Sequence, residues 1–124
     1  MHLGPLDTAV LPRKRFQNAP AYVCLAADGT IADVGTGTRH LLEYDDNEAI
    51  DPCFFTHVHQ RNLYQVMRDI AEMVTLGKPR ASWLVRLRTG RARWTWVRAT
   101  VQNHLTDAMQ VIRIDLTPIR AAIA

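Results

Sequence analysis

The sequence contains little cysteine, and its cysteines are far apart. Cys24 and Cys53 are the two cysteines of the chain, and they form neither a CxxC motif nor another metal-ligand spacing. Small secreted domains usually carry a denser cysteine framework for disulfides. The cysteine content therefore favours a cytoplasmic protein with free thiols.

Long hydrophobic runs are also absent. No apolar run approaches the roughly 20 residues needed to span a bilayer, and residues 1–10 lack a basic region followed by an apolar stretch. We therefore expect no membrane partner, no signal peptide and a cytoplasmic location. The length of 124 residues suits one domain with a core and one internal pocket.

Acidic residues are missing from a long stretch of the second half. After Glu72 the next acid is Asp107, and the bases between them are Lys78, Arg80, Arg86, Arg88, Arg91, Arg93 and Arg98. A basic stripe can hold nucleic acid, but no DNA-reading motif accompanies this one. We expect the stripe to be a solvated strand face, with nucleic-acid binding as the less favoured alternative.

Catalytic motifs are missing as well. The sequence contains no Ser-His-Asp order, no phosphate-binding loop and no paired-carboxylate motif. His57 and His59 bring two imidazoles close together in sequence, but no third metal ligand is placed by spacing. We therefore expect neither an enzyme nor a metal site.

Strand, turn and helix signals follow one another in a regular order. Residues 21–27 read as a strand, Asp28-Gly29 as a hairpin turn and residues 30–34 as the returning strand. Short helical turns are expected between residues 38 and 59. Residues 1–19 carry prolines that disfavour a long helix, so we interpret them as a flank or arm.

The clearest helix is predicted over residues 60–76. Its apolar side chains recur at steps of three and four residues, namely Leu63, Val66, Met67, Ile70, Met73 and Val74. Three alternating strands follow, at residues 81–88, 93–102 and 109–116. The order predicts an α+β domain over residues 20–118, with a five-stranded antiparallel sheet and helices on one face. Residues 119–124 would begin a C-terminal linker.

Six short motifs occur in this framework. They are Asp28-Gly29-Thr30-Ile31, Leu41-Leu42-Glu43-Tyr44, Pro52-Cys53-Phe54-Phe55 with Val58-His59, Gly77-Lys78-Pro79, Val85-Arg86-Leu87-Arg88 with Trp96-Val97, and Asp115-Leu116-Thr117. In this order and spacing the chain resembles the PAS family of sensory domains. Gly35, Glu43 and Gln60-Arg61-Asn62 depart from the usual family residues, which loosens the subfamily assignment and not the fold.

The resemblance implies a sensor module without catalytic activity of its own. Such domains hold a pocket between the sheet and the long helix, and they commonly dimerise through the outer sheet face and flanking helices. They signal through a C-terminal segment to an effector such as a histidine kinase of a two-component system, a diguanylate cyclase or a transcription factor. Because a fold does not fix a function, the site has to be argued from its own residues.

Flavin is one cofactor that the resemblance brings into question. Light-sensing flavin domains of the family carry a reactive cysteine near the position of Cys53. The amides that read the flavin edge are replaced here by Val85, Thr95 and Arg113. Leaving that polar edge unpaired costs roughly 1–3 kcal/mol per group, so we expect no flavin.

Haem is the other cofactor. It needs an axial histidine that faces the pocket, and the helix predicted over residues 60–76 has none. His57 or His59, just before that helix, could serve instead. A haem-binding sensor is therefore an alternative and not our first prediction.

Strand alternation separates an inner from an outer sheet face. If Val97, Ala99 and Val101 face the long helix, then Trp94 and Trp96 face outward. Large exposed apolar side chains that lie together usually mark a contact surface. We predict a dimer or partner surface made of Trp94, Trp96, Ile112 and Ile114. The alternative is that the arm of residues 1–20 covers these side chains.

The inner face and the long helix define the predicted pocket. Its predicted lining is Trp83, Val85, Thr95, Val97, Ala99, Val111, Arg113, Met67 and Ile70. Arg113 is the charged member, and a buried guanidinium must be paired or bind an anion. It would anchor a carboxylate or phosphate of a ligand. The alternatives are an internal ion pair with Glu43, Asp33 or Asp51, or an inverted strand that places Arg113 in solvent.

These features predict a sensory domain that binds a small, largely apolar ligand, with or without an acidic head. Binding would change the geometry of a dimer or of the C-terminal helix, provided that the ligand distinguishes two states. A ligand-free interaction or dimerisation module is the alternative from another class. The expected partners are a small molecule, a second copy of the chain, and an effector domain or partner protein.

Overall fold

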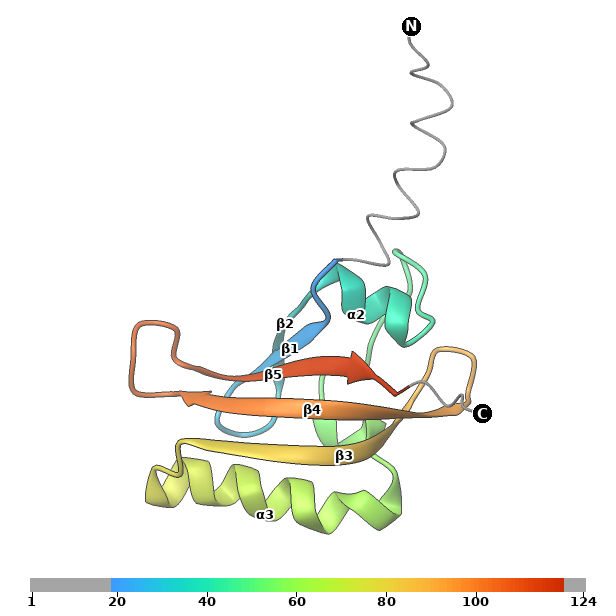
Figure 1. Ribbon diagram of the computed structural model, residues 1–124. Coiled ribbons are helices and arrows are strands. Elements are labelled where there is room, and N and C mark those ends of the chain that lie inside the picture. Colours follow the sequence, from blue (N-terminus) through green and yellow to red (C-terminus); the bar gives the residue numbers. More distant parts are fainter. Residues whose placement is uncertain (1–18, 120–124) are drawn as a thin grey trace, which may run out of the picture.

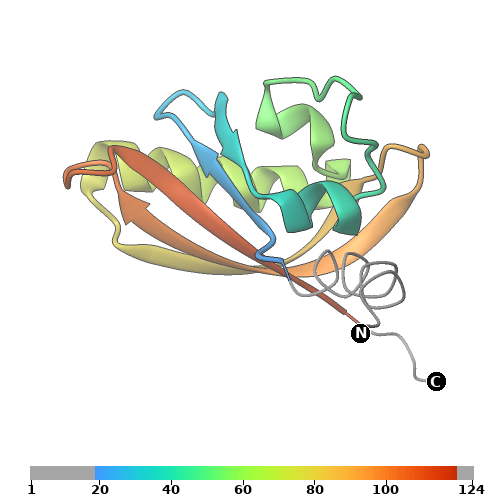
Figure 2. The ribbon, with the colours of Figure 1, turned by 90° about the horizontal axis from the view of Figure 1, so that it is seen from above.

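The computed structural model describes residues 19–119, which form a sheet with helices on one of its faces (Figures 1 and 2). The elements are β1 Tyr22–Leu25, β2 Ile31–Val34, α2 Thr36–Leu41, η1 Phe54–His57, α3 Gln60–Leu76, β3 Arg80–Arg88, β4 Trp94–His104 and β5 Val111–Pro118. All strand pairs are antiparallel, in the order β2-β1-β5-β4-β3. The predicted α+β class and five-stranded sheet are confirmed. The predicted flank and linker lie, apart from Ala19 and Ile119, outside the described residues.

The turn between β1 and β2 depends on two neighbouring residues. The Asp28 carboxylate accepts the backbone N–H of Thr30 at 2.9 Å. Gly29 has a φ of +89°, and a Cβ at this position would lie 2.5 Å from the Phe55 ring. Glycine therefore meets both the backbone requirement and the close approach of η1.

Helix α3 has the predicted bounds and clear signals at both ends. The His59 imidazole caps its start by accepting the Arg61 N–H at 3.0 Å, and Gly77 ends it with a φ of +71°. Val66, Ile70 and Met73 are buried in the core, as their spacing predicts. The placement of Met67 in the pocket is wrong, because its side chain lies beside this stripe and is 46% exposed.

Strands β3 and β4 alternate as predicted. The buried set on these strands is Trp83, Val85, Leu87, Val97, Ala99 and Val101, and Trp94 and Trp96 point to the other side. The core lies between this inner face and the helices. Within residues 19–119, no helix combines the length and the apolar character that crossing a bilayer requires.

The predicted orientation of β5 is wrong. Val101 pairs with Ile114 and Gln102 pairs with Arg113, and directly opposite residues of an antiparallel pair share a face. Ile112 and Ile114 are therefore fully buried in the core and cannot belong to a partner surface. Val111 and Arg113 lie on the outer face. The alternative of an inverted strand, with Arg113 facing solvent, is the correct one.

Candidate functional site

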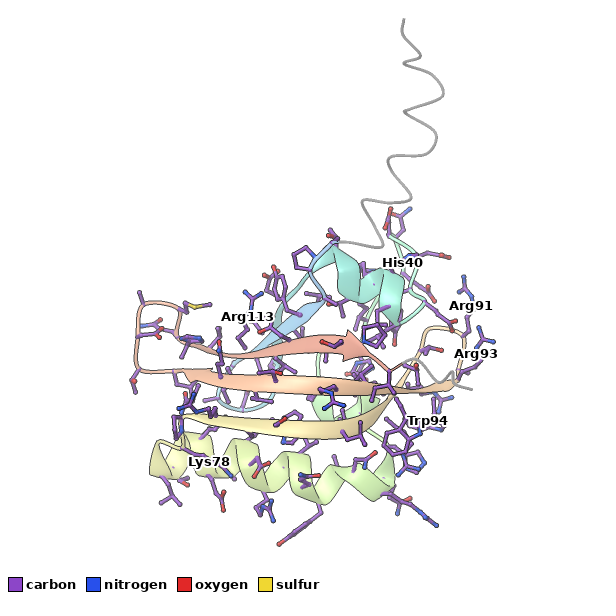
Figure 3. All side chains as sticks on the ribbon, in the orientation of Figure 1. His40, Lys78, Arg91, Arg93, Trp94 and Arg113 are labelled. Carbon is purple, nitrogen blue, oxygen red and sulfur yellow. The ribbon has the colours of Figure 1, made fainter. Side chains whose placement is uncertain are left out.

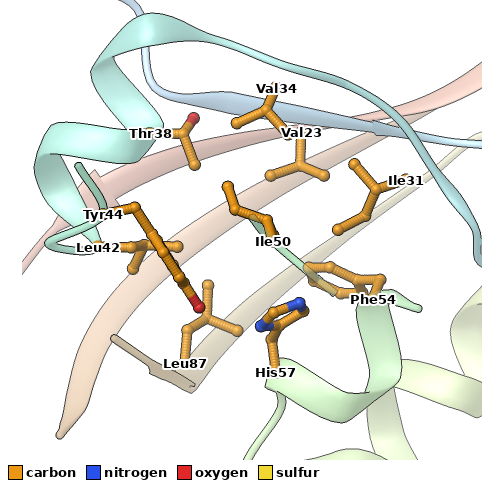
Figure 4. A pocket seen from close by; sticks show the side chains of 10 residues that line it. All are labelled: Val23, Ile31, Val34, Thr38, Leu42, Tyr44, Ile50, Phe54, His57 and Leu87. Atoms are coloured by element: carbon orange, nitrogen blue, oxygen red, sulfur yellow. The ribbon is translucent and has the colours of Figure 1, made fainter. Parts of the chain in front are cut away.

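A small apolar cavity lies between the β1–β2 hairpin and the helices beside it (Figure 4). Five parts of the chain supply its walls: the hairpin, α2 with the residues that follow it, the loop before η1, η1 itself, and β3. The lining residues are Val23, Ile31, Val34, Thr38, Leu42, Tyr44, Ile50, Phe54, His57 and Leu87. The cavity offers about 20 Å³ to the centres of water-sized atoms. A water molecule needs about 10–15 Å³ on this measure, so a larger ligand requires the walls to move.

Three of the lining residues are polar. The Thr38 hydroxyl donates to the Tyr22 carbonyl at 2.6 Å and is occupied by that bond. The Nε2 of His57 lies 2.8 Å from the Asp51 carbonyl. A carbonyl can only accept, so Nε2 carries the hydrogen, and Nδ1 is the ring nitrogen that accepts in the tautomer with its single hydrogen on Nε2.

Tyr44 is the third polar residue, and it stands edge-on to His57. The two ring centroids are 6.5 Å apart, with an interplanar angle of 84°. Burial raises the pKa of the Tyr44 hydroxyl, which keeps the phenol neutral and able to donate. The cavity thus combines an apolar body with one imidazole and one phenol.

The loop of residues 43–50 closes one side of the cavity. One Arg39 nitrogen donates to the backbone carbonyls of Asp45 and Glu48, at 2.8 and 2.9 Å. From the β3–β4 turn, Arg93 pairs with Glu43 at 2.7 Å and Arg91 approaches Asp45 at 3.4 Å. Polar contacts near the surface therefore hold the loop that carries Tyr44 and Ile50.

Two open surface grooves border this cavity. One, of about 400 Å³, shares Tyr44 with the lining, and the other, of about 360 Å³, shares Ile31, Val34 and Ile50. Arg39 lines both grooves. Both grooves therefore adjoin the segment that Arg39 holds.

None of the nine residues predicted for the pocket lines this cavity. Trp83, Val85, Val97, Ala99 and Ile70 are fully packed in the core, and Thr95 is half-buried. Val111 and Arg113 lie on the opposite face of the sheet, and Met67 is exposed. Most of the lining residues lie between residues 31 and 57, where the sequence predicts one short strand, at residues 30–34, and otherwise only short helical turns.

Arg113 has no anion-binding role in the cavity. Its guanidinium donates to the Asp115 carboxylate at 3.1 Å and stacks over the Tyr22 ring at 4.2 Å from the centroid. Figure 3 shows it on the outward side of β5. The acidic partner is therefore Asp115, and not Glu43, Asp33 or Asp51.

The residues present do not fit haem or flavin in this arrangement. His57 faces the cavity, but its Nε2 is bonded to Asp51 and the space is far smaller than a macrocycle. His59 caps α3 and contacts Trp94 with ring centroids 4.7 Å apart. Cys53 is exposed and does not line the cavity. Among residues 19–119, His, Cys, Asp and Glu form no group of three that could hold a metal ion.

The predicted outward placement of Trp94 and Trp96 is confirmed, with exposed fractions of 44% and 43%. Arg86 stacks over the Trp96 ring at 4.5 Å, and Arg88 lies 5.7 Å from the Trp94 centroid. These tryptophans and the cavity lie on opposite sides of the sheet.

No protein-family model and no curated protein sequence matches the chain. Solved structures are similar to it. The PAS domain of an HTR-like protein from Haloarcula marismortui has a TM-score of 0.64 at 16% identity, covering 92% of this chain and 99% of that chain. A PAS domain from Colwellia psychrerythraea has a TM-score of 0.66 at 16% identity, with coverage of 91% and 98%. A PAS domain from a two-component sensor histidine kinase has a TM-score of 0.60 at 16% identity, with coverage of 94% and 99%. Over residues 19–119, the part that the structure describes, the chain has the fold of a PAS domain.

Proposed function

We propose that this chain is a sensory module that binds a small, largely apolar molecule in the cavity beside the β1–β2 hairpin. The observation that carries the proposal is the composition of the cavity wall. Apolar side chains supply most of the surface, and His57 and Tyr44 supply one acceptor and one donor. Ligand sites typically combine an apolar body with a few placed polar groups in this way.

The ligand should be neutral and carry at most one or two polar atoms. An acidic head has no cation to meet in the cavity, because Arg113 lies on the other sheet face and is paired with Asp115. His57 and Tyr44 suit a hydroxyl, a carbonyl or a ring N–H instead.

Binding would be transmitted through β1 to the end of β5. Val23 lines the cavity and pairs with Ile114 on β5, and β5 ends at Pro118. A ligand that prefers a displaced Val23 would shift this pair, and the shift would reach the segment after β5. One of the similar structures is a domain of a sensor histidine kinase, which supports an effector of this kind as the receiver.

A ligand-free interaction module is the second candidate. The small free volume of the cavity and the exposed Trp94 and Trp96 favour it. In that case the protein would be a homodimer or would contact another protein through the outer sheet face, and the cavity would be a packing defect.

Native mass spectrometry of the purified protein, followed by thermal shifts with small neutral aromatics such as indole, tests the proposal. We expect a co-purified small molecule or a rise in melting temperature with ligand concentration, because a ligand of the native state stabilises it by mass action. Val34→Phe should abolish the shift by filling the cavity, whereas Val111→Phe on the opposite sheet face should leave it intact. A protein that carries no ligand, and shows no shift with any member of the panel, would support the second candidate.

A further inference from the structure

Strands β3 and β4 present a mixed aromatic and basic surface on the side of the sheet away from the cavity. We define the Trp–Arg face by six outward side chains: Leu84, Arg86, Arg88, Trp94, Trp96 and Arg98. The register places Leu84 opposite Arg98, Arg86 opposite Trp96 and Arg88 opposite Trp94. Leu84 is 53% exposed, so an apolar strip runs across the face with a guanidinium beside each of its members.

The two tryptophans are held in place before any partner arrives. Arg86 stacks over Trp96, and its Nε donates to the Asn62 side chain on α3 at 3.1 Å. His59 and Arg88 flank the Trp94 ring. Neither indole N–H finds an acceptor among residues 19–119. Aromatic side chains that are already ordered lose little conformational entropy on binding, and tryptophan and arginine dominate the energetics of many interfaces.

The charge of the face is of one sign. The outward positions of β3 and β4 carry no carboxylate, and Arg86, Arg88 and Arg98 form no ion pair within the described part of the chain. Among residues 19–119, four arginines outside this face form ion pairs: Arg68 with Asp69, Arg91 with Asp45, Arg93 with Glu43, and Arg113 with Asp115. The Trp–Arg face therefore holds positive charge that the domain itself does not neutralise.

This charge argues against two occupants. A second copy placed face to face would set arginines against arginines, which costs free energy. Residues 1–18 contain Arg13, Lys14 and Arg15 but only one acid, Asp7, so they match the face poorly. The complementary partner has to bring carboxylates together with apolar side chains.

We propose that the Trp–Arg face docks an acidic segment of a partner protein, in which Asp or Glu residues flank aliphatic ones. The aliphatic side chains cover Leu84, Trp94 and Trp96. The carboxylates receive paired N–H bonds from the guanidinium groups, which offer the planar geometry that such contacts need. A single-stranded nucleic acid would also meet aromatic and basic groups here, but Leu84 within the strip favours a protein.

The test uses the full chain and a fluorescein-labelled peptide in which glutamates flank a pair of leucines, at low ionic strength. Its counterpart has glutamine in place of every glutamate, and an oligo-dT strand represents nucleic acid. We expect the glutamate peptide to bind with an affinity that falls as salt rises, and the glutamine peptide to bind at least about tenfold more weakly. Trp96→Ala and Arg98→Gln should each weaken binding by about tenfold.

Two variants serve as controls. Tyr64→Ala removes a more exposed aromatic ring on α3, and Arg113→Gln removes an arginine whose charge Asp115 already balances. Each should change the affinity by less than about twofold. Unchanged melting temperatures would show that all variants fold, and the result does not depend on whether the cavity binds a ligand.

Several outcomes would overturn the proposal. The glutamate peptide could fail to bind, bind no better than the glutamine peptide, or lose as much affinity in the controls as in Trp96→Ala. Tighter binding of oligo-dT than of the peptide would assign the face to nucleic acid. A dimer in sedimentation that dissociates in the Trp96→Ala variant would assign it to a second copy.

Discussion

Asp69 shows at the scale of one residue how a buried charge is accommodated in this core. Its side chain lies on the inner face of α3, and the residue is 3% exposed. The Trp83 indole N–H donates to it at 2.8 Å and the Lys78 ammonium at 2.9 Å. Burial opposes ionisation, but these hydrogen bonds outweigh it and lower the pKa of Asp69. The carboxylate thus ties β3 and the segment after α3 to the helix.

Acid should weaken this tie. Because the folded pKa is below the unfolded value of about 3.9, the stabilisation is complete above that value and is lost as pH falls through the folded pKa. Asp69→Asn should lower the free energy of unfolding at pH 7 by about 1–3 kcal/mol. It should also flatten the acid limb of the stability curve, as measured by urea denaturation from neutral to acidic pH.

Asp107→Asn is the matched control for this prediction. Asp107 also has a lowered pKa, which it owes to His104, but it lies in an exposed hairpin turn. Its replacement should change stability at neutral pH much less than Asp69→Asn does. Equal losses of stability from the two variants would show that the buried Asp69 network stabilises the fold no more than an exposed contact does.

At the scale of elements, the loop of residues 43–50 is the part of the cavity wall that polar surface contacts hold. Arg93 and Glu43 are 68% and 34% exposed in their side chains, so salt screens their interaction. Glu43 also has a φ of +62°, an uncommon conformation outside glycine. Apart from Tyr44, which packs against the core, the loop is thus held by a few surface contacts.

Removal of one of these contacts should loosen the loop. Arg93→Gln should increase amide hydrogen exchange of residues 44–50 by up to about fivefold, in line with the small free energy of exposed ion pairs. Exchange in β4 and β5 should stay constant. Arg61→Gln on α3 is a control with the same charge change. An equal effect of both variants on exchange in the loop would refute the idea that the Arg93–Glu43 ion pair holds it.

The elements themselves could be read from the sequence, but the orientation of one strand could not. Apolar spacing and Gly77 predict helix α3, and the strict alternation of apolar and polar residues predicts β3 and β4. β5 has apolar side chains on both faces, with Val111 on one and Ile112 and Ile114 on the other. Its orientation is decided by pairing with Val101, a contact between distant parts of the chain that local patterns do not encode.

The position and lining of the cavity could not be predicted from the sequence for the same physical reason. Its lining is assembled from five separate parts of the chain, and apolar residues such as Ile50 and Leu42 stand in irregular segments without periodicity. Only His57 among the lining residues was considered as a site residue, and for a cofactor that the space does not fit.

At the scale of the whole molecule, β3 connects the two sides of the sheet. Leu87 lines the cavity, and its neighbours Arg86 and Arg88 belong to the Trp–Arg face. A ligand that displaces Leu87 must move the backbone between these two arginines. Sites that bias a common element are coupled, and the coupling is reciprocal.

We therefore predict that a cavity ligand changes the affinity of the Trp–Arg face. Titration of the acidic peptide with and without saturating indole should give different dissociation constants, and the peptide should change the indole affinity by the same factor. Leu87→Ala should reduce this factor while both sites still bind. Identical peptide affinity in the presence and absence of indole would show that the sheet separates the two sites.

Strands β1 and β5, the first and last along the described part of the chain, lie side by side in the sheet, and this has a mechanical consequence. Tyr22 pairs with Asp115, and the Ala21 carbonyl accepts the Leu116 N–H at 2.8 Å. Because β1 and β5 are antiparallel, the start of one and the end of the other meet at the same corner. Tension applied between residues 19 and 119 acts first on the β1–β5 hydrogen bond nearest this corner, the one at Ala21. The remaining β1–β5 bonds then bear the load one after another, and not all at the same time. A pull on residue 19 therefore separates Tyr22 from Asp115 before the inner β1–β5 pairs, while β5 stays paired with β4 on its other side.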